Sequence, residues 1–161
     1  MANEFSFANS DGSELVRRKR VVSVTASTKT VRQVELEGKE IKMDRAAGIT
    51  FTLPRATGSG DVYRFRVGTT LTSNNYKVQV ANTSDFMRGK AWLLAGTNAS
   101  FATANTGTAT TESDTVTLNG TTTGGLLGDY IELVDIAKNT WHVECSLSGS
   151  GTAATPFSVA V

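Results

Sequence analysis

The clearest pattern in the chain is an alternation of apolar and polar residues towards its C-terminal end. Every second residue of one stretch is apolar, which predicts a β-strand with one apolar face: Trp141, Val143, Cys145 and Leu147. The segment before it, residues 130–136, carries apolar residues at both odd and even positions, which predicts a strand covered on both faces. A tight turn is predicted at residues 137–139. Together they predict a hairpin around which a β core packs.

Further short segments with β-branched or alternating apolar residues predict strands elsewhere. They are Val21–Thr25, Val31–Leu36, Lys39–Met43, Ile49–Leu53, Val62–Val67, Tyr76–Val80, Lys90–Leu94, Thr115–Asn119 and Phe157–Val161. Lys39–Met43 is expected to pair back on Val31–Leu36, and Ala99–Asp114 is expected to be a long exposed loop. The pattern predicts an all-β fold with a single β-sandwich or barrel, jelly-roll-like, at residues 21–161 and an extended N-terminal arm at residues 1–20.

Two parts of the chain repeat one order of features: a strand, a Gly-rich loop, an Asp and a second strand. The first part runs from Thr52 through Asp61, and the second runs from Thr117 through Asp129. This order indicates either a pseudo-repeat of two hairpins packed face to face or the ordinary arrangement of β-hairpins.

Composition agrees with one all-β domain and narrows the expected partners. The 161 residues are 39% hydrophobic and only 19% charged, and Thr, Ser, Asn and 15 Gly fill much of the rest, which suits strands and turns. The net charge is +1, so no overall field attracts nucleic acid or an anionic membrane, and neither is expected as a partner. A single Cys excludes an internal disulfide, and no apolar run approaches the ~20 residues of a membrane helix or resembles a signal peptide.

The N-terminal arm is polar, lacks periodicity and ends in four consecutive cations. Such a run is either a solvated tether or an electrostatic clasp on an acidic surface of a partner. Two aromatic residues near the start of the arm favour the clasp, since exposed aromatic side chains in a tail tend to enter a pocket. The candidate contact residues of the arm are therefore Phe5, Phe7, Arg17, Arg18, Lys19 and Arg20.

The residues that usually carry catalysis or bind metals are sparse. His142, the single histidine, stands between Trp141 and Val143 and is expected on the outer face of its strand. Cys145 is expected on the core face as an inert thiol, and no Gly-x-Ser-x-Gly turn supplies a nucleophile. Gly124–Gly128 lacks the spacing and the Lys of a phosphate-binding loop, and one His with one Cys makes no usual zinc site. We therefore expect a protein that is not an enzyme and uses no metal or cofactor.

Three segments resemble a group of small virion proteins of tailed bacteriophages. They are ITFTLPRATGSGDVYRFRV at residues 49–67, TSNNYKVQVANTSDFMRGKAWLLA at residues 72–95, and DTVTLNGTTTGGLLGDYIELVDIAKNTWHVECSLSGSGTAATPF at residues 114–157. The resemblance spans roughly two thirds of the chain and departs from the usual pattern at Cys145, where a small residue is common. It does not extend to the arm, so it implies no role for the arm.

The resemblance implies a head decoration protein, also called a cement protein. Such proteins are non-enzymatic, bind the outer surface of the mature capsid and stabilise it, commonly as trimers at local three-fold positions. The implied partners are other copies of the chain, in a homotrimer, and the major capsid protein of the phage head. The implied location is the outer surface of the virion, after synthesis in the host cytoplasm. In that setting the six arm residues are hypothesised to bind the capsid.

Two other classes of function stay open at this point. The chain could instead be a phage tail, fibre or head-spike component that binds a host receptor or glycan, through exposed aromatic residues and the predicted loop at Ala99–Asp114. A hydrolase domain of a virion is the third class, but the sequence does not visibly assemble acid and base groups for it.

Overall fold

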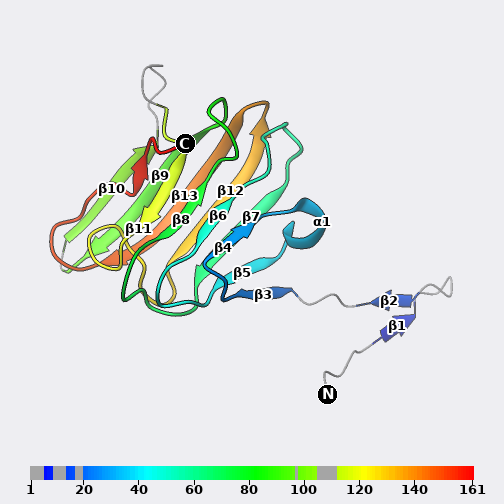
Figure 1. The fold of residues 1–161 in the computed structure, drawn as a ribbon, viewed down its shortest axis with the longest axis horizontal. Coiled ribbons are helices and arrows are strands. Elements are labelled where there is room, and N and C mark those ends of the chain that lie inside the picture. The colour runs from blue at the N-terminus through cyan, green and yellow to red at the C-terminus, as the bar shows by residue number, and fades with distance from the viewer. Residues whose placement is uncertain (1–5, 9–13, 17–19, 97, 105–111) are drawn as a thin grey trace.

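The structure is a computed structural model that describes residues 6–8, 14–16, 20–96, 98–104 and 112–161. Two mixed β-sheets, one of seven strands and one of five, enclose the hydrophobic core (Figure 1). The larger sheet has the strand order β10-β9-β13-β12-β7-β5-β3, and the smaller sheet has the order β14-β11-β8-β6-β4. The expected all-β fold is therefore confirmed, and the body is a two-sheet sandwich.

Each sheet draws its strands from the whole length of the body. The strands of the larger sheet are β3 (Val21–Val24), β5 (Glu40–Met43), β7 (Val62–Val67), β9 (Phe86–Ala95), β10 (Asn98–Ala104), β12 (Tyr130–Ala137) and β13 (Thr140–Gly149). Those of the smaller sheet are β4 (Thr28–Thr30), β6 (Thr50–Thr52), β8 (Tyr76–Gln79), β11 (Thr115–Leu118) and β14 (Phe157–Ser158).

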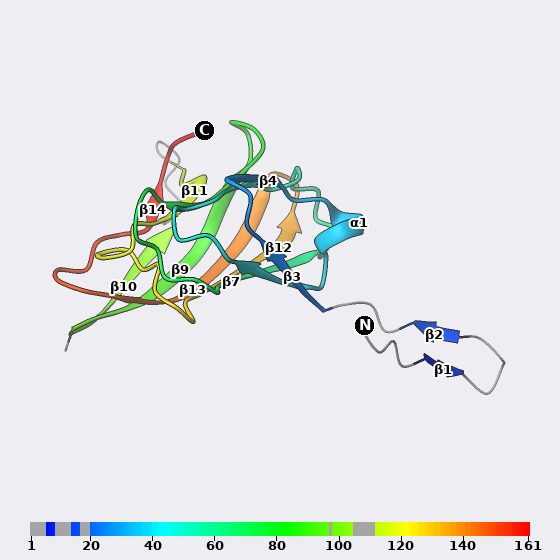
Figure 2. The same cartoon turned by 60° about the horizontal axis from the view of Figure 1, so that its bottom comes forward.

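The first half of the body winds back and forth between the two sheets (Figure 2). β3, β5 and β7 lie parallel and side by side in the larger sheet, and β4, β6 and β8 do the same in the smaller sheet. The chain therefore winds as a coil, and each turn adds one strand to each sheet. Val22, Ile41 and Phe65 lie opposite one another on the three parallel strands of the larger sheet. In the second half, antiparallel pairs predominate: β12 pairs with β7 and β13, and β11 pairs with β8 and β14.

The core lies between the two inner sheet faces and is rich in aromatic rings. Trp141 and Tyr63 are fully buried, with ring centroids 5.8 Å apart, and Phe51 and Phe65 meet edge to face at 5.0 Å. The predicted C-terminal hairpin is confirmed as β12 and β13, joined through Asn139, whose φ of 63° is a conformation that Asn tolerates. The strongest alternation in the sequence therefore marks the centre of the larger sheet.

The prediction of a strand at residues 31–36 is wrong. Gln33–Leu36 forms the short helix α1, and residues 39–43 do not pair back on it, because β5 joins β3 and β7 instead. Leu36 is buried while Val34 is 87% exposed, so this segment does not present its apolar residues to the core as a strand would. Across the described parts of the chain, no helix is long and apolar enough to cross a membrane.

The segment Ala99–Asp114, expected to be a loop, contributes a strand of the larger sheet. β10 pairs antiparallel with β9 over its whole length, and the expected strand at Lys90–Leu94 is the middle of β9. Small residues such as Ser100 and Ala102 occupy the inward positions of β10, so its sequence lacks the alternation of large apolar and polar residues that predicts a strand. Pairing with a long neighbour, rather than the composition of the segment, makes it a strand.

β12 is covered on one face only, contrary to the prediction. Ile131 and Leu133 are buried against the core, whereas Tyr130 and Val134 are half-buried and Ile136 is 52% exposed. The reason is that the described residues place no second layer on the outer face of the larger sheet. The outward side chains of β12 are shielded only by those of the neighbouring strands.

The two parts with a repeated order of features are not a pair of hairpins. The first part passes from β6 to β7 and the second from β11 to β12, so each crosses from the smaller sheet to the larger one. Because the two strands of each part lie in different sheets, the interpretation as hairpins packed face to face is wrong.

A buried carboxylate fixes the first Gly-rich loop. Asp135 of β12 accepts hydrogen bonds from the backbone N–H groups of Thr57, Gly58 and Ser59, at 2.7–3.2 Å. The hydroxyls of Thr57 and Ser59 donate to the same carboxylate at 3.1 and 3.0 Å. Burial by itself raises the pKa of Asp135, but these donors outweigh it, so the pKa lies below its ordinary value.

Asp129 holds the second Gly-rich loop in a related way. Its carboxylate accepts hydrogen bonds from the N–H groups of Gly125 at 2.7 Å, Leu126 at 3.1 Å and Ser148 at 2.8 Å. Here burial outweighs the donors and raises the pKa of Asp129. The two loops are thus tied to the larger sheet by carboxylates in different electrostatic settings.

Candidate interaction surfaces

The structure leaves most of the predicted arm contacts untested. Four of the six residues lie outside the described part of the chain: Phe5, Arg17, Arg18 and Lys19. Phe7 belongs to β1 (Ser6–Ala8), which pairs with β2 (Glu14–Val16) as a two-stranded sheet. Arg20 is exposed, and its carbonyl oxygen accepts a hydrogen bond from the N–H of Glu40 at 2.8 Å. This bond places the root of the arm beside β5, at the β3 end of the larger sheet.

The residues considered for chemistry do not meet. His142 points outward from β13, and its Nε2 lies 3.7 Å from Oε1 of Glu144. Cys145 points inward from the same strand, and burial raises the pKa of its thiol well above the ordinary value. Within the described residues, no cluster of three or more His, Cys, Asp or Glu side chains is arranged to hold a metal ion.

A row of charged side chains crosses the outer face of the larger sheet. Five residues on neighbouring strands share one register position: Glu40, Arg64, Glu132, Glu144 and Lys90. Arg64 Nε donates to Glu132 Oε2 at 2.7 Å, and the hydroxyl of Tyr130 donates to the same oxygen at 2.7 Å. The Tyr130 bond, supported by Arg64, keeps the pKa of Glu132 below its ordinary value despite partial burial. Because Arg64 is already paired with Glu132 on this exposed face, we interpret the row as a solvated surface and not as a site that binds an anion.

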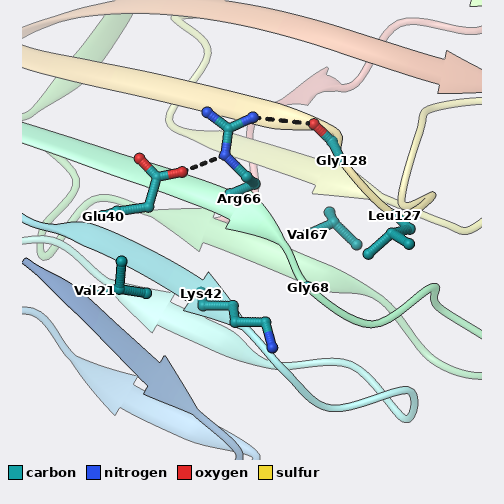
Figure 3. A pocket seen from close by; sticks show the side chains of 8 residues that line it. All are labelled: Val21, Glu40, Lys42, Arg66, Val67, Gly68, Leu127 and Gly128. Carbon is teal, nitrogen blue, oxygen red and sulfur yellow. Dashed lines mark hydrogen bonds and ion pairs between the residues drawn. The ribbon is translucent and has the colours of Figure 1, made fainter.

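A groove lies at the end of this face where the arm begins. It has a volume of about 600 Å³ and is lined by Val21, Glu40, Lys42, Arg66, Val67, Gly68, Leu127 and Gly128 (Figure 3). Arg66 forms an ion pair with Glu40 and also donates to the carbonyl oxygen of Gly128, while Lys42 pairs with Asp44 at 2.9 Å. Since the charged groups of the groove have partners, its exposed apolar side chains, Val21 and Leu127, are the groups that a binding partner could contact.

An apolar patch occupies the opposite end of the same face. Trp92, Leu94 and Phe101 are 57%, 54% and 65% exposed and belong to the β9–β10 hairpin. Phe101 is the cross-strand partner of Trp92, and their ring centroids lie 5.9 Å apart. We call these three residues the hairpin patch. The largest contiguous apolar patch on a protein surface is often functional, so the hairpin patch is a candidate binding surface.

Comparisons with known proteins give no relative from which to assign these surfaces. No family model, curated protein or solved structure matches the chain. The described surface offers two apolar features, the groove and the hairpin patch, separated by a row of paired charges. Such an arrangement can bind other macromolecules at its two ends.

Sequence reasoning missed the hairpin patch, although a signal was present. Residues 91–95 carry apolar side chains at both odd and even positions, a pattern that usually predicts a strand buried on both faces. In the structure the outward set of β9 is exposed, because the described residues place no second layer on the outer face of the larger sheet.

Proposed function

We propose that this chain is a non-enzymatic structural protein of a tailed-bacteriophage virion that decorates the outer surface of the mature head and stabilises it. Its partners are the major capsid protein and other copies of itself, in the trimer that the resemblance implies. The observation that carries the proposal is the outer face of the larger sheet, which presents the hairpin patch at one end and the root of the arm at the other.

The architecture of the body agrees with a role in reinforcement. Loops on the sandwich are tied to strands far away in sequence: Asp135 reaches back 76–78 residues to the loop at residues 57–59. Long-range bonds of this kind resist local opening, because the loop cannot move without breaking contacts to the central sheet. A protein that stiffens a shell needs such a body and needs no reaction site.

Besides a stiff body, a decoration protein needs a segment that attaches it to the shell, and the arm suits this role. Several arms on one assembly multiply weak contacts through effective concentration. The cations Arg17–Arg20 fit an acidic shell surface, and Phe5 and Phe7 fit apolar pockets.

Co-sedimentation with phage heads tests the proposal. Purified protein is mixed with expanded shells that lack it, with unexpanded shells and with tails, and bound protein is measured over a concentration series. We expect saturable binding to expanded shells and little binding to the other two particles. Binding to tails alone would favour the fibre or receptor-binding alternative, and binding to none of the particles would contradict a structural role on the head.

Removing residues 1–20 should leave the body folded and weaken shell binding by about tenfold or more, since both anchor classes are lost. Replacing Arg17–Arg20 with glutamine should remove mainly the part of the affinity that fades as salt is raised. Replacing Phe5 and Phe7 with alanine should weaken binding at all salt concentrations. Far-ultraviolet circular dichroism checks the fold, and the same co-sedimentation measures the affinity.

A matched control separates the arm from charge in general. Arg32, Arg55 and Lys138 are exposed cations of the body outside the row of charges and the hairpin patch, and they can be replaced together by glutamine. This variant should bind shells almost as well as the unaltered protein. If it binds as weakly as the variant lacking Arg17–Arg20, or if the protein without residues 1–20 binds undiminished, the arm is not the anchor.

A further inference from the structure

β10 forms one edge of the larger sheet and pairs there with a single described strand. It lies at the end of the sheet opposite β3, and among the described residues its strand partner is β9 alone (Figures 1 and 2). Apart from its ladder with β9, none of the seven residues of β10 forms a backbone hydrogen bond to another described residue. Because an antiparallel strand alternates the direction of its N–H and C=O groups, about half of those of β10 face away from β9.

The other three edges are short, whereas β10 is long and uncharged. β3 has four residues, β4 has three and contains Lys29, and β14 has two. β10 has the sequence NASFATA, without a charge, a Pro or a Gly. Proteins usually protect an exposed edge with such residues or with a very short strand, because a bare edge pairs with another strand. β10 has no such residue. Among the described residues, Ala153, Ala154 and Thr155 border the same hollow as Ser100–Thr103 of β10, but none of them forms a backbone hydrogen bond to this strand.

The hairpin patch lies beside this edge. Trp92, Leu94 and Phe101 together expose on the order of 300 Å² of side-chain surface, given the 150–250 Å² that a large aromatic residue buries. A stable interface needs about 800 Å² from each partner, so the patch alone is too small. Adding the backbone edge and the side chains of β10 to the patch enlarges the contact on the same hairpin.

We infer that β10 pairs antiparallel with β10 of a second copy of this chain. Phe101 is the middle residue of the strand, so a two-fold axis through it places Phe101 opposite Phe101 of the second copy. Ala99 then lies opposite Thr103, and Ser100 lies opposite Ala102. No charged residue of one strand faces a charged residue of the other. The strand is complementary to itself, which is what an isologous contact requires.

The same register joins the two hairpin patches. Trp92 and Phe101 are neighbours across β9 and β10 with their side chains on the outer face. Pairing of the two β10 strands continues this row into Phe101 and Trp92 of the second copy. Four aromatic rings then form one strip across four adjacent strands, and the inner members of the strip lose their exposure to water.

This contact is independent of the proposed function. A two-fold pairing cannot close a three-fold ring, so in the trimer implied by the resemblance it would link a subunit of one trimer to a subunit of the next. Shell binding and edge pairing are measured separately. A protein that binds shells without edge pairing contradicts only the inference, and a paired protein that binds no particle contradicts only the proposed function.

Cysteine cross-linking tests both the contact and its register in the full chain. The native Cys145 is buried and stays out of the reaction. Facing residues on paired strands have Cβ atoms about 4.5–5.5 Å apart, close enough for a disulfide after a small adjustment. We expect an equimolar mixture of Ala99→Cys and Thr103→Cys proteins to form disulfide-linked dimers on mild oxidation. Either protein alone should not, since like positions are then about 13 Å apart along the strands.

A second pair of variants distinguishes the interface from random collision. Adding Phe101→Lys to both cysteine proteins should lower the rate of mixed cross-linking by about tenfold or more, since it places two cations at the axis. Adding Leu127→Lys, at a residue that is 69% exposed but distant from the hairpin patch, should not change it. Equal cross-linking in the single-cysteine proteins, no cross-linking in the mixture, or equal sensitivity to both lysines would overturn the inference.

Discussion

Replacing Trp141 with alanine should lower the free energy of unfolding by about 3–5 kcal/mol, the range for removing a fully buried aromatic residue. The indole is completely buried between the two sheets and contacts the ring of Tyr63 at a centroid distance of 5.8 Å. Removing it leaves a cavity near the turn end of the hairpin of β12 and β13, where the strands on both sides of β13 cannot collapse inward without breaking ladder bonds. Urea unfolding followed by circular dichroism measures the change.

Two further substitutions make the Trp141 experiment specific. Trp92→Ala removes the other tryptophan, which is 57% exposed, and should change the stability of the isolated subunit by well under 1 kcal/mol, about the size usual for surface positions. Trp141→Phe should cost clearly less than Trp141→Ala, because it keeps a ring and removes an indole N–H that has no hydrogen-bond partner among the described residues. A near-neutral Trp141→Ala together with a costly His142→Ala would mean that the strand register is shifted by one residue.

The hairpin around Trp141 was predictable because its information is local. Alternation of period two fixes which side chains face the core, and a turn residue at Asn139 fixes where the chain reverses. The same reasoning located β7, β8 and β11. Polar and apolar residues alternate along each of these strands, and in β7 and β8 the apolar residues are also the more buried ones.

The winding of the first half was not predictable in the same way. β3, β5 and β7 pair with strands that are their second neighbours in sequence, because the intervening strands lie in the other sheet. Short-range reasoning assumes that consecutive strands pair, which is why residues 39–43 were expected to pair with residues 31–36. α1 arises in that connection, where the chain passes between the sheets and only Leu36 of the helix is buried.

The candidate surfaces divide along similar lines. The arm stands out in sequence because its charges and aromatic residues are consecutive or nearly so. The hairpin patch depends on Phe101 of β10 lying beside Trp92 of β9, and no pattern within either strand specifies that register. Asp135 left a weaker signal, since it occupies an inward position after Ile131 and Leu133, where an acidic residue needs donors to satisfy it. Which donors these are depends on a loop 76–78 residues earlier.

Replacing Asp135 with asparagine should lower the free energy of unfolding at neutral pH by about 2–4 kcal/mol, since hydrogen bonds to a charged group are worth more than neutral ones and a lost partner leaves buried donors unpaired. The carboxylate is 2% exposed and accepts from three backbone N–H groups and two hydroxyls. Asparagine keeps one acceptor oxygen, but its amide N–H₂ then faces donors. The loop at residues 57–59 should detach first, which hydrogen exchange at Gly58 can report.

The cost of Asp135→Asn should also depend on pH. The pKa of Asp135 is lower in the folded protein than its ordinary value, so the folded state binds this proton less readily than the unfolded chain does. The stabilisation by the carboxylate is therefore fully present above an unfolded pKa of about 3.9 and is lost as the pH falls through the folded pKa. The difference in unfolding free energy between the two proteins should be largest above pH about 5 and should narrow below pH about 4.

Asp129→Asn is the matched control, because Asp129 also accepts three backbone hydrogen bonds but has its pKa raised by burial. A raised pKa means that the folded state binds the proton more readily than the unfolded chain, so ionisation of Asp129 lowers stability as the pH rises through that interval. Asp129→Asn should therefore cost less at neutral pH than Asp135→Asn, and its cost should not shrink on acidification. If both variants lose the same stability with the same pH profile, the two carboxylates act only as packing groups, and the bonds from Thr57, Gly58 and Ser59 do not hold the loop through charge.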